Sequence, residues 1–178
     1  MKKRNILTIP NLLSLLRLFM IPQLMWLCLQ KQDYLQTAVL LALSGATDVL
    51  DGIIARKFNM ISEFGKALDP VADKLTQMAM LYCVGTTFPE IRLLLILLVM
   101  KEVLTGAMSL ISIKKTGHVQ AAQWHGKVVT VLLYILIADK LLPGLLSGAL
   151  LLVCIGMMIL SAALYWKRNW DSIKSRSQ

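Results

Sequence analysis

Charged residues are scarce in this chain. Only 16% of its 178 residues are charged, 57% are hydrophobic, and the mean hydropathy is +0.66. Because a soluble domain carries about a quarter charged residues, this composition excludes a soluble protein and predicts an integral membrane protein. The gaps between apolar runs are too short for a second domain, so we expect one domain over residues 1–178.

Cysteine and histidine are equally sparse. Cys28, Cys83 and Cys154 lie inside apolar runs without paired spacing, and His118 and His125 have no partners at the spacing of metal ligands. These patterns exclude a disulfide framework and a zinc site. We interpret the cysteines as small packing residues and the histidines as ordinary interface residues.

Acidic residues number only 10 against 19 Lys and Arg, which gives a net charge of +9. The basic residues are scattered along the ends of apolar runs and are not gathered in one module, so we expect no nucleic-acid partner. Their excess fits membrane topology, attraction to anionic lipid headgroups and binding of a phosphate-bearing substrate.

Long apolar runs dominate the chain. A spanning helix needs about 20 mostly apolar residues, and six runs are close to this length: Leu12–Leu29, Tyr34–Arg56, Ser62–Thr86, Pro89–Ile113, Trp124–Leu141 and Gly144–Trp166. The basic start could indicate a signal peptide, but no cleavage site follows it, and Arg17 and Pro22 interrupt the first run. We therefore predict an all-α membrane protein with six transmembrane helices.

The distribution of cations predicts the orientation. If the six helices alternate in direction, 16 of the 19 Lys and Arg residues lie on one side, and Lys31, Arg92 and Lys140 lie on the other. Cytoplasmic loops carry the excess of Lys and Arg. We therefore expect a multi-pass protein of the plasma membrane with both termini and the polar site on the cytoplasmic side.

Four aspartates stand out in the apolar stretch from residue 48 to residue 73: Asp48, Asp51, Asp69 and Asp73. A charged side chain at the centre of a bilayer costs at least about 2.5–3.5 kcal/mol, so carboxylates there indicate a functional site. Spacings of three and four residues place Asp48 with Asp51, and Asp69 with Asp73, on single helix faces. A short hairpin would bring the two faces together around a cavity open to the cytoplasm.

Repulsion among these carboxylates would splay the helices unless cations neutralise them. All the candidate ligands are hard oxygens, which favours Mg²⁺ or Mn²⁺, and a pair of such ions suits a phosphoryl-type displacement. Arg56 and Lys66 would hold phosphate oxygens, and Ser62 would add a neutral hydrogen bond. The alternative is a structural ion-pair network of the aspartates with Arg56, Lys66 and Lys74.

A cation transporter is a different class of protein that also uses intramembrane carboxylates. Arg56 and Lys66 argue against it, since added positive charge would repel a travelling ion but favour a pyrophosphate-bearing substrate. The chain also lacks the paired interruptions of many inverted-repeat transporters.

The run DVLDGIIARKFNMISEFGKALDPVADK, from Asp48 to Lys74, closely resembles the signature of the CDP-alcohol phosphotransferase family. The resemblance implies six transmembrane helices, a homodimer, and transfer of a phosphatidyl group from a CDP-lipid to an alcohol with release of CMP. It also implies that Asp48, Asp51 and Asp69 ligate a two-metal centre, and that Asp73 completes it and takes the proton of the attacking hydroxyl. The CDP portion would contact three further residues of the run: Gly52, Arg56 and Ser62.

Two further segments resemble phosphatidylglycerophosphate synthases within this family: TIPNLLSLLRLFMIP, from Thr8 to Pro22, and WHGKVVT, from Trp124 to Thr130. They imply transfer from CDP-diacylglycerol to glycerol 3-phosphate, with Lys127 and Lys101 binding the acceptor. Lys101 stands where the family has Arg, and this departure counts against glycerol 3-phosphate. Phosphatidylglycerol, the acceptor in cardiolipin synthesis, is the alternative, followed by other acceptors of the family such as inositol phosphate or serine. Both lysines could instead be simple positive-inside residues, and Arg17 could either contact a phosphate or anchor the helix at the interface.

Overall fold

The computed structural model describes residues 8–57, 63–116, 124–142 and 148–174. Over these ranges all regular secondary structure is helical, which confirms the all-α prediction. The six helices are α1 (Ile9–Leu29), α2 (Tyr34–Lys57), α3 (Glu63–Thr87), α4 (Glu90–Thr116), α5 (Trp124–Leu141) and α6 (Gly148–Lys174). Their bounds agree with the six apolar runs to within a few residues at most ends.

Local sequence explains where the helices start and stop. The Thr8 side chain caps α1 by accepting from the backbone N–H of Asn11, and a proline in the first turn needs no hydrogen-bond partner. The last helix continues eight residues beyond the apolar run that predicted it. There Trp166 and Trp170 stack at a centroid distance of 6.5 Å, because residues four apart share one helix face.

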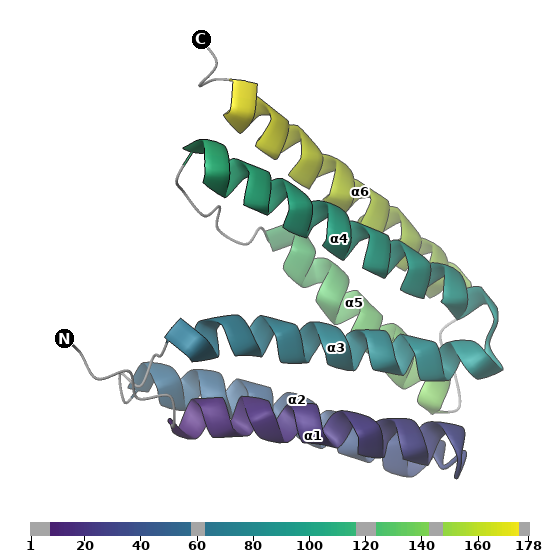
Figure 1. Ribbon diagram of the computed structural model, residues 1–178. Coiled ribbons are helices and arrows are strands. Elements are labelled where there is room, and N and C mark those ends of the chain that lie inside the picture. Colours follow the sequence, from purple (N-terminus) through teal and green to yellow (C-terminus); the bar gives the residue numbers. More distant parts are fainter. Residues whose placement is uncertain (1–7, 58–62, 117–123, 143–147, 175–178) are drawn as a thin grey trace.

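The helices form two groups (Figure 1). Helix α1 packs against α2 and α3 in one group, α4 lies along α6 in the other, and α5 contacts α2, α3 and α6. The axes of α4 and α6 are inclined to those of α1, α2 and α3. Helix α5 and the packing of α3 against α4 therefore join the two groups, and the side chains of α5 can reach both α2 and α3. In the described residues α2 and α3 pack mainly against α1 and not against each other, so the close α2–α3 pairing expected from the short hairpin is not observed.

A continuous apolar core runs between the groups. Its fully buried members come from several helices: Leu24 of α1, Met80 and Leu81 of α3, Leu94 and Leu98 of α4, Leu133, Leu136 and Ile137 of α5, and Met158 of α6. Burying each such side chain contributes roughly 1.5–3 kcal/mol relative to an exposed position. This core fixes α5 against α3, which matters for the site described below.

Consecutive helices alternate in direction, so the last turns of α2 and α4 and the first turns of α3 and α5 lie toward the same end of the bundle as the start of α1 (Figure 1). At the opposite end the described residues hold Lys31, Arg92 and Lys140 as their cations. The fold thus agrees with the helix alternation on which the predicted charge asymmetry depends.

Two helices are long and apolar enough to cross a membrane within the described residues. These are the segments Asn11–Leu29 of α1 and Gly148–Arg168 of α6, and a shorter apolar segment covers Tyr34–Leu50 of α2. The remaining helices carry more charged residues, notably Asp69, Asp73 and Lys74 in α3. The prediction of six spans therefore stays a prediction.

Candidate functional site

Three of the four predicted aspartates have described side chains, and all three lie toward one end of the bundle. Asp48 belongs to α2, and Asp69 and Asp73 belong to successive turns of α3. The side chains of Asp51, Gly52, Arg56 and Lys66, and all of Ser62, lie outside the described residues. The roles predicted for this second set therefore stay predictions.

Asp48 forms an ion pair with α1. One oxygen of its carboxylate, Oδ1, lies 2.6 Å from Nη2 of Arg17. The Arg17 side chain is 2% exposed, whereas that of Asp48 is 48% exposed. Arg17 is therefore buried inside the bundle and neutralises the carboxylate on that side, which rules out the interpretation of Arg17 as an interface anchor.

Asp69 is held by the same helix. The Ser14 hydroxyl donates a hydrogen bond to Oδ1 of Asp69. Ser14, Arg17 and Asn11 are all buried and are spaced three residues apart, so they form one polar face on an otherwise apolar helix. This polar face of α1 orients carboxylates on both α2 and α3.

Asp73 is held from the other side, by α5. The Tyr134 hydroxyl donates to Oδ1 of Asp73 at 2.8 Å, across 61 residues of sequence. Each of the three described carboxylates therefore has a donor from a helix other than its own: Arg17 of α1 for Asp48, Ser14 of α1 for Asp69 and Tyr134 of α5 for Asp73. Such contacts fix the direction in which each carboxylate presents its remaining oxygen.

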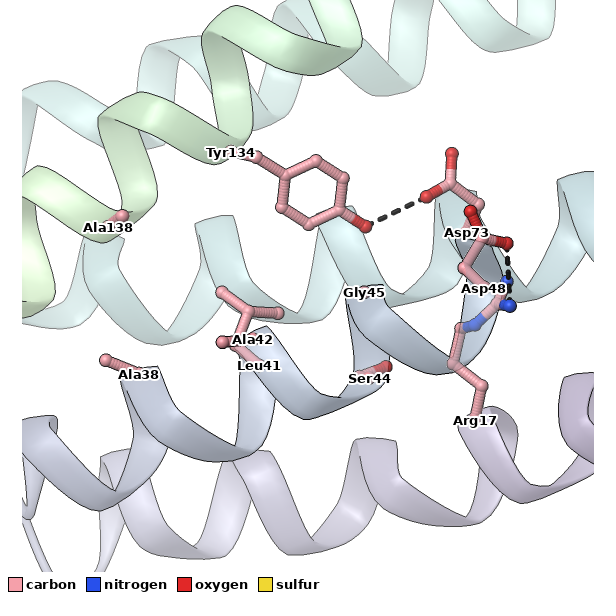
Figure 2. Close-up of a pocket in the computed structure, with 10 residues that line it drawn as sticks. All are labelled: Arg17, Ala38, Leu41, Ala42, Ser44, Gly45, Asp48, Asp73, Tyr134 and Ala138. Atoms are coloured by element: carbon pink, nitrogen blue, oxygen red, sulfur yellow. Dashed lines mark hydrogen bonds and ion pairs between the residues drawn. The ribbon is translucent and has the colours of Figure 1, made fainter. Parts of the chain in front are cut away.

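A cavity of about 290 Å³ lies between α1, α2, α3 and α5 (Figure 2). One part of its lining is polar and comprises Arg17, Asp48, Asp73 and the Tyr134 hydroxyl. Most of the rest is apolar or small: Ala38, Leu41, Ala42, Gly45 and Ala138, with Ser44 beside them. The cavity can therefore receive a molecule with both a charged group and an apolar part.

The predicted acceptor lysines are not part of this lining. Lys101 is buried and its ammonium donates to Glu102 at 2.8 Å, while Lys74 of α3 donates to the same carboxylate at 2.5 Å. One carboxylate thus serves two ammonium groups, so the cluster of Lys74, Lys101 and Glu102 keeps a net positive charge. Lys127 is exposed in the first turn of α5, where it has no ion pair with another described residue.

The carboxylate oxygens in the cavity are suitable ligands for a hard divalent cation. Asp48 and Asp73 share one cavity, and carboxylate oxygens are the ligands that Mg²⁺ and Mn²⁺ prefer. Among the residues with described side chains, no three Asp, Glu, His or Cys residues form a group close enough to hold an ion. The predicted set of four metal ligands also includes Asp51, whose side chain lies outside the described residues.

Several site residues were not found from the sequence. The spacing of Asn11, Ser14 and Arg17 in an apolar helix was an available signal, since three polar residues on one face need a buried partner. Tyr134 gave no such signal, because a tyrosine in an apolar run is ordinary. His125 also differs from its prediction as an interface residue: it is buried and shares a hydrogen bond of 2.8 Å with Ser161 of α6.

Known proteins with similar sequences support the resemblance. The chain is 29% identical to the CDP-diacylglycerol–glycerol-3-phosphate 3-phosphatidyltransferase of Bacillus subtilis (strain 168), in an alignment covering 94% of this chain and 97% of that protein. It is 45% identical to the cardiolipin synthase (CMP-forming) of Streptomyces coelicolor over 49% of this chain and 42% of that protein. A transferase of Aquifex aeolicus with the same name as the Bacillus protein is 44% identical over 39% of this chain and 38% of its own length.

The Streptomyces and Aquifex alignments span less than half of those relatives, whereas the Bacillus alignment spans nearly all of that protein. The chain also matches the CDP-alcohol phosphatidyltransferase family over residues 7–166. This match includes all six helices except the end of α6, and it contains the carboxylates and the three side chains that hold them. The chain therefore belongs to the CDP-alcohol phosphatidyltransferase family.

Proposed function

We propose that this protein transfers the phosphatidyl group of CDP-diacylglycerol to glycerol 3-phosphate, forming phosphatidylglycerophosphate and CMP. The observation that carries the proposal is the cavity in which Asp48 and Asp73 face a largely apolar wall. A lipid activated by a nucleotide has this dual character, with charged phosphates beside an apolar glyceride. The Bacillus relative that aligns over nearly the whole chain bears the name of this activity.

The reaction exchanges one phosphorus–oxygen bond for another. The acceptor hydroxyl oxygen attacks the phosphorus that carries the diacylglycerol, the bond from this phosphorus to CMP breaks, and the hydroxyl proton passes to a base. Catalysis of such a transfer depends on positioning and on stabilising charge on the phosphate oxygens. Asp73 is the proposed base, since it lines the cavity and one of its oxygens is already occupied by Tyr134.

Four carboxylates would hold the divalent ions of this proposal: Asp48, Asp51, Asp69 and Asp73. When bound there, a pair of Mg²⁺ or Mn²⁺ ions would supply the positive charge that stabilises a phosphoryl-type displacement. The protein contributes the orientation of these carboxylates through Arg17, which is buried beside Asp48, and through Ser14, which donates to Asp69. Gly52, Arg56, Ser62 and Lys66 are proposed to contact the CDP moiety.

The proposal places all six helices across the plasma membrane, with the carboxylates toward the cytoplasm, and the family resemblance suggests a homodimer. Helix lengths support the spans: α2, α3 and α4 have 24, 25 and 27 residues and extend about 36–40 Å, and the 18 residues of α5 extend about 27 Å. The hydrocarbon core is about 30 Å thick. Helix α4 also exposes apolar side chains along its length, including Leu93, Ile96, Val103 and Leu110.

Phosphatidylglycerol is the second candidate acceptor, which would make the product cardiolipin. The Streptomyces cardiolipin synthase shares 45% identity over half of the chain. In addition, the carboxylate of Glu102 accepts from the Lys101 ammonium and partly cancels the attraction of Lys101 for the phosphate of a soluble acceptor. A cation transporter is no longer a candidate, because the chain belongs to a family of phosphatidyltransferases.

The test is a product assay on purified protein in detergent micelles. CDP-diacylglycerol and Mg²⁺ are supplied with labelled glycerol 3-phosphate or labelled phosphatidylglycerol, and both CMP and the lipid product are identified. We expect CMP and phosphatidylglycerophosphate in equal amounts, and no product from the Asp73→Asn variant. A cardiolipin product would favour the second candidate, whereas absence of CMP release, or release unchanged in Asp73→Asn, would refute the proposal.

Asp33→Asn is the matched control. Asp33 accepts from the backbone N–H of Gln36 at the start of α2, at the end of the bundle opposite Asp48 and Asp73. Asn caps a helix about as well as Asp. This variant should therefore retain full activity while making the same chemical change as Asp73→Asn.

A further inference from the structure

Tyr134 joins the base proposed above to a helix that carries no part of the family signature. Its hydroxyl donates to Oδ1 of Asp73 at 2.8 Å, and both side chains line the same cavity (Figure 2). Helix α5 therefore contributes directly to the geometry of the carboxylate that faces the reacting groups.

The tyrosine is itself held in place by the core. Leu133, Leu136 and Ile137, its neighbours on α5, are at most 1% exposed, and Tyr134 packs against this cluster. A tyrosine ring has only two side-chain torsions, and a packed ring holds its hydroxyl within a small volume. Asp73, by contrast, has a short carboxylate that can rotate about its own axis unless a donor fixes one oxygen.

We propose that Tyr134 is a positioning residue for the transfer reaction, and that its hydrogen bond to Oδ1 fixes Asp73 so that Oδ2 is the oxygen presented to the acceptor hydroxyl. This inference rests on the proposed function. It adds a role for α5 in the chemical step, distinct from substrate binding, and it assigns the two oxygens of Asp73 different tasks.

The other two described carboxylates also have one oxygen held by a donor from another helix. Arg17 holds Oδ1 of Asp48, and Ser14 holds Oδ1 of Asp69. Supporting groups of this kind orient the residues that act directly, and misplacement of a reacting group by about 1 Å can cost about 100-fold in rate. Of the three side chains that hold the carboxylates, Tyr134 is the one that contacts the proposed base, Asp73.

The test compares Tyr134→Phe, which removes the hydroxyl and keeps the ring, with Tyr34→Phe. The Tyr34 hydroxyl makes a hydrogen bond of 3.2 Å with Thr87, joining α2 to α3 at the end of the bundle away from Asp73. The control therefore undergoes the same chemical change and loses a contact between helices without affecting Asp73. CMP release is measured as kcat and KM for CDP-diacylglycerol and for glycerol 3-phosphate, per amount of monodisperse protein.

For Tyr134→Phe we expect kcat to fall about 30-fold, equivalent to about 2 kcal/mol of transition-state free energy, which is typical of a lost hydrogen bond to a charged group. Both KM values should stay within about twofold, because neither substrate is proposed to contact the hydroxyl. CMP binding in the presence of Mg²⁺, measured by calorimetry, should also be unchanged. Tyr34→Phe should keep its kcat.

A second variant, Tyr134→Leu, removes the ring as well. Its kcat should be as low as that of Tyr134→Phe, and its KM for CDP-diacylglycerol should rise because part of the cavity wall is lost. The inference is overturned if Tyr134→Phe keeps kcat within about threefold of the wild type, or if its loss is matched by weaker CMP binding. Wild-type protein that releases no CMP would refute the proposed function itself, and this inference with it.

Discussion

Removing the guanidinium of Arg17 should destabilise the protein through Asp48. Arg17 is buried and its Nη2 lies 2.6 Å from Oδ1 of Asp48. At an effective dielectric constant of about 20, the attraction at this distance is about 6 kcal/mol. The desolvation cost of burying the guanidinium offsets several kcal/mol of this attraction. Asp48 is half-exposed, so water also screens part of the attraction.

We therefore expect Arg17→Met to lower the free energy of unfolding by about 2 kcal/mol, which is about 4–8 °C in the unfolding midpoint for a chain of this size. Methionine preserves much of the apolar stem, so the main change is the loss of charge. Arg168→Met, an exposed site on α6, should change stability by less than about 0.5 kcal/mol and serves as the control.

A double-mutant cycle with Asp48→Asn isolates the pair itself. The variant with both substitutions has no uncompensated charge, so its loss should be smaller than the sum of the two single losses by about 1–3 kcal/mol. Thermal unfolding in detergent with a chelator measures this, since no divalent cation can then substitute for the guanidinium. Additivity within about 0.5 kcal/mol would show that the ion pair does not stabilise the protein, contrary to the reasoning above.

Three further outcomes are expected. Lys127→Ala should raise KM for glycerol 3-phosphate several-fold more than KM for CDP-diacylglycerol, while Lys31→Ala at the other end of the bundle should raise neither; equal effects on both substrates would argue against acceptor binding by Lys127. Glu102→Gln should lower the free energy of unfolding by about 1–3 kcal/mol, because two ammonium groups at 2.5 and 2.8 Å lose their carboxylate, and an unchanged midpoint would contradict this. Leu133→Ala, at a fully buried position, should cost about 2–5 kcal/mol, whereas Ile135→Ala at an exposed one should cost much less, as thermal unfolding of the pair would reveal.

Much of the fold could be predicted from the sequence, because each helix is indicated by the hydropathy of its own residues. Apolar runs of about 20 residues separated by short polar gaps predicted six helices, and six are present in the described residues with closely similar bounds. The end of α6 was not predicted because most of residues 167–174 are polar, and hydropathy indicates only the apolar part of a helix. Helix formation there depends instead on neighbours along the same face, such as Trp166 and Trp170.

The carboxylates of the site were also predictable, since a charge in an apolar helix needs a functional or structural reason. Their partners were not. Ser14 meets Asp69 across 55 residues and Tyr134 meets Asp73 across 61, and these pairings depend on how three helices pack. Glu102 illustrates the same limit: besides its chain neighbour Lys101, it accepts from Lys74 of α3, 28 residues away, and this pairing depends on how α3 packs against α4.

The pairing of Arg17 with Asp48 constrains how the chain is inserted during synthesis. When α1 first leaves the ribosome, its arginine has no counterion, and an isolated arginine in the middle of a helix disfavours entry into the bilayer by about 2.5–3.5 kcal/mol. The compensating carboxylate emerges 31 residues later, on the helix that follows. Integration of the first segment is therefore favoured by the second, and we expect the two to enter the lipid together as a hairpin.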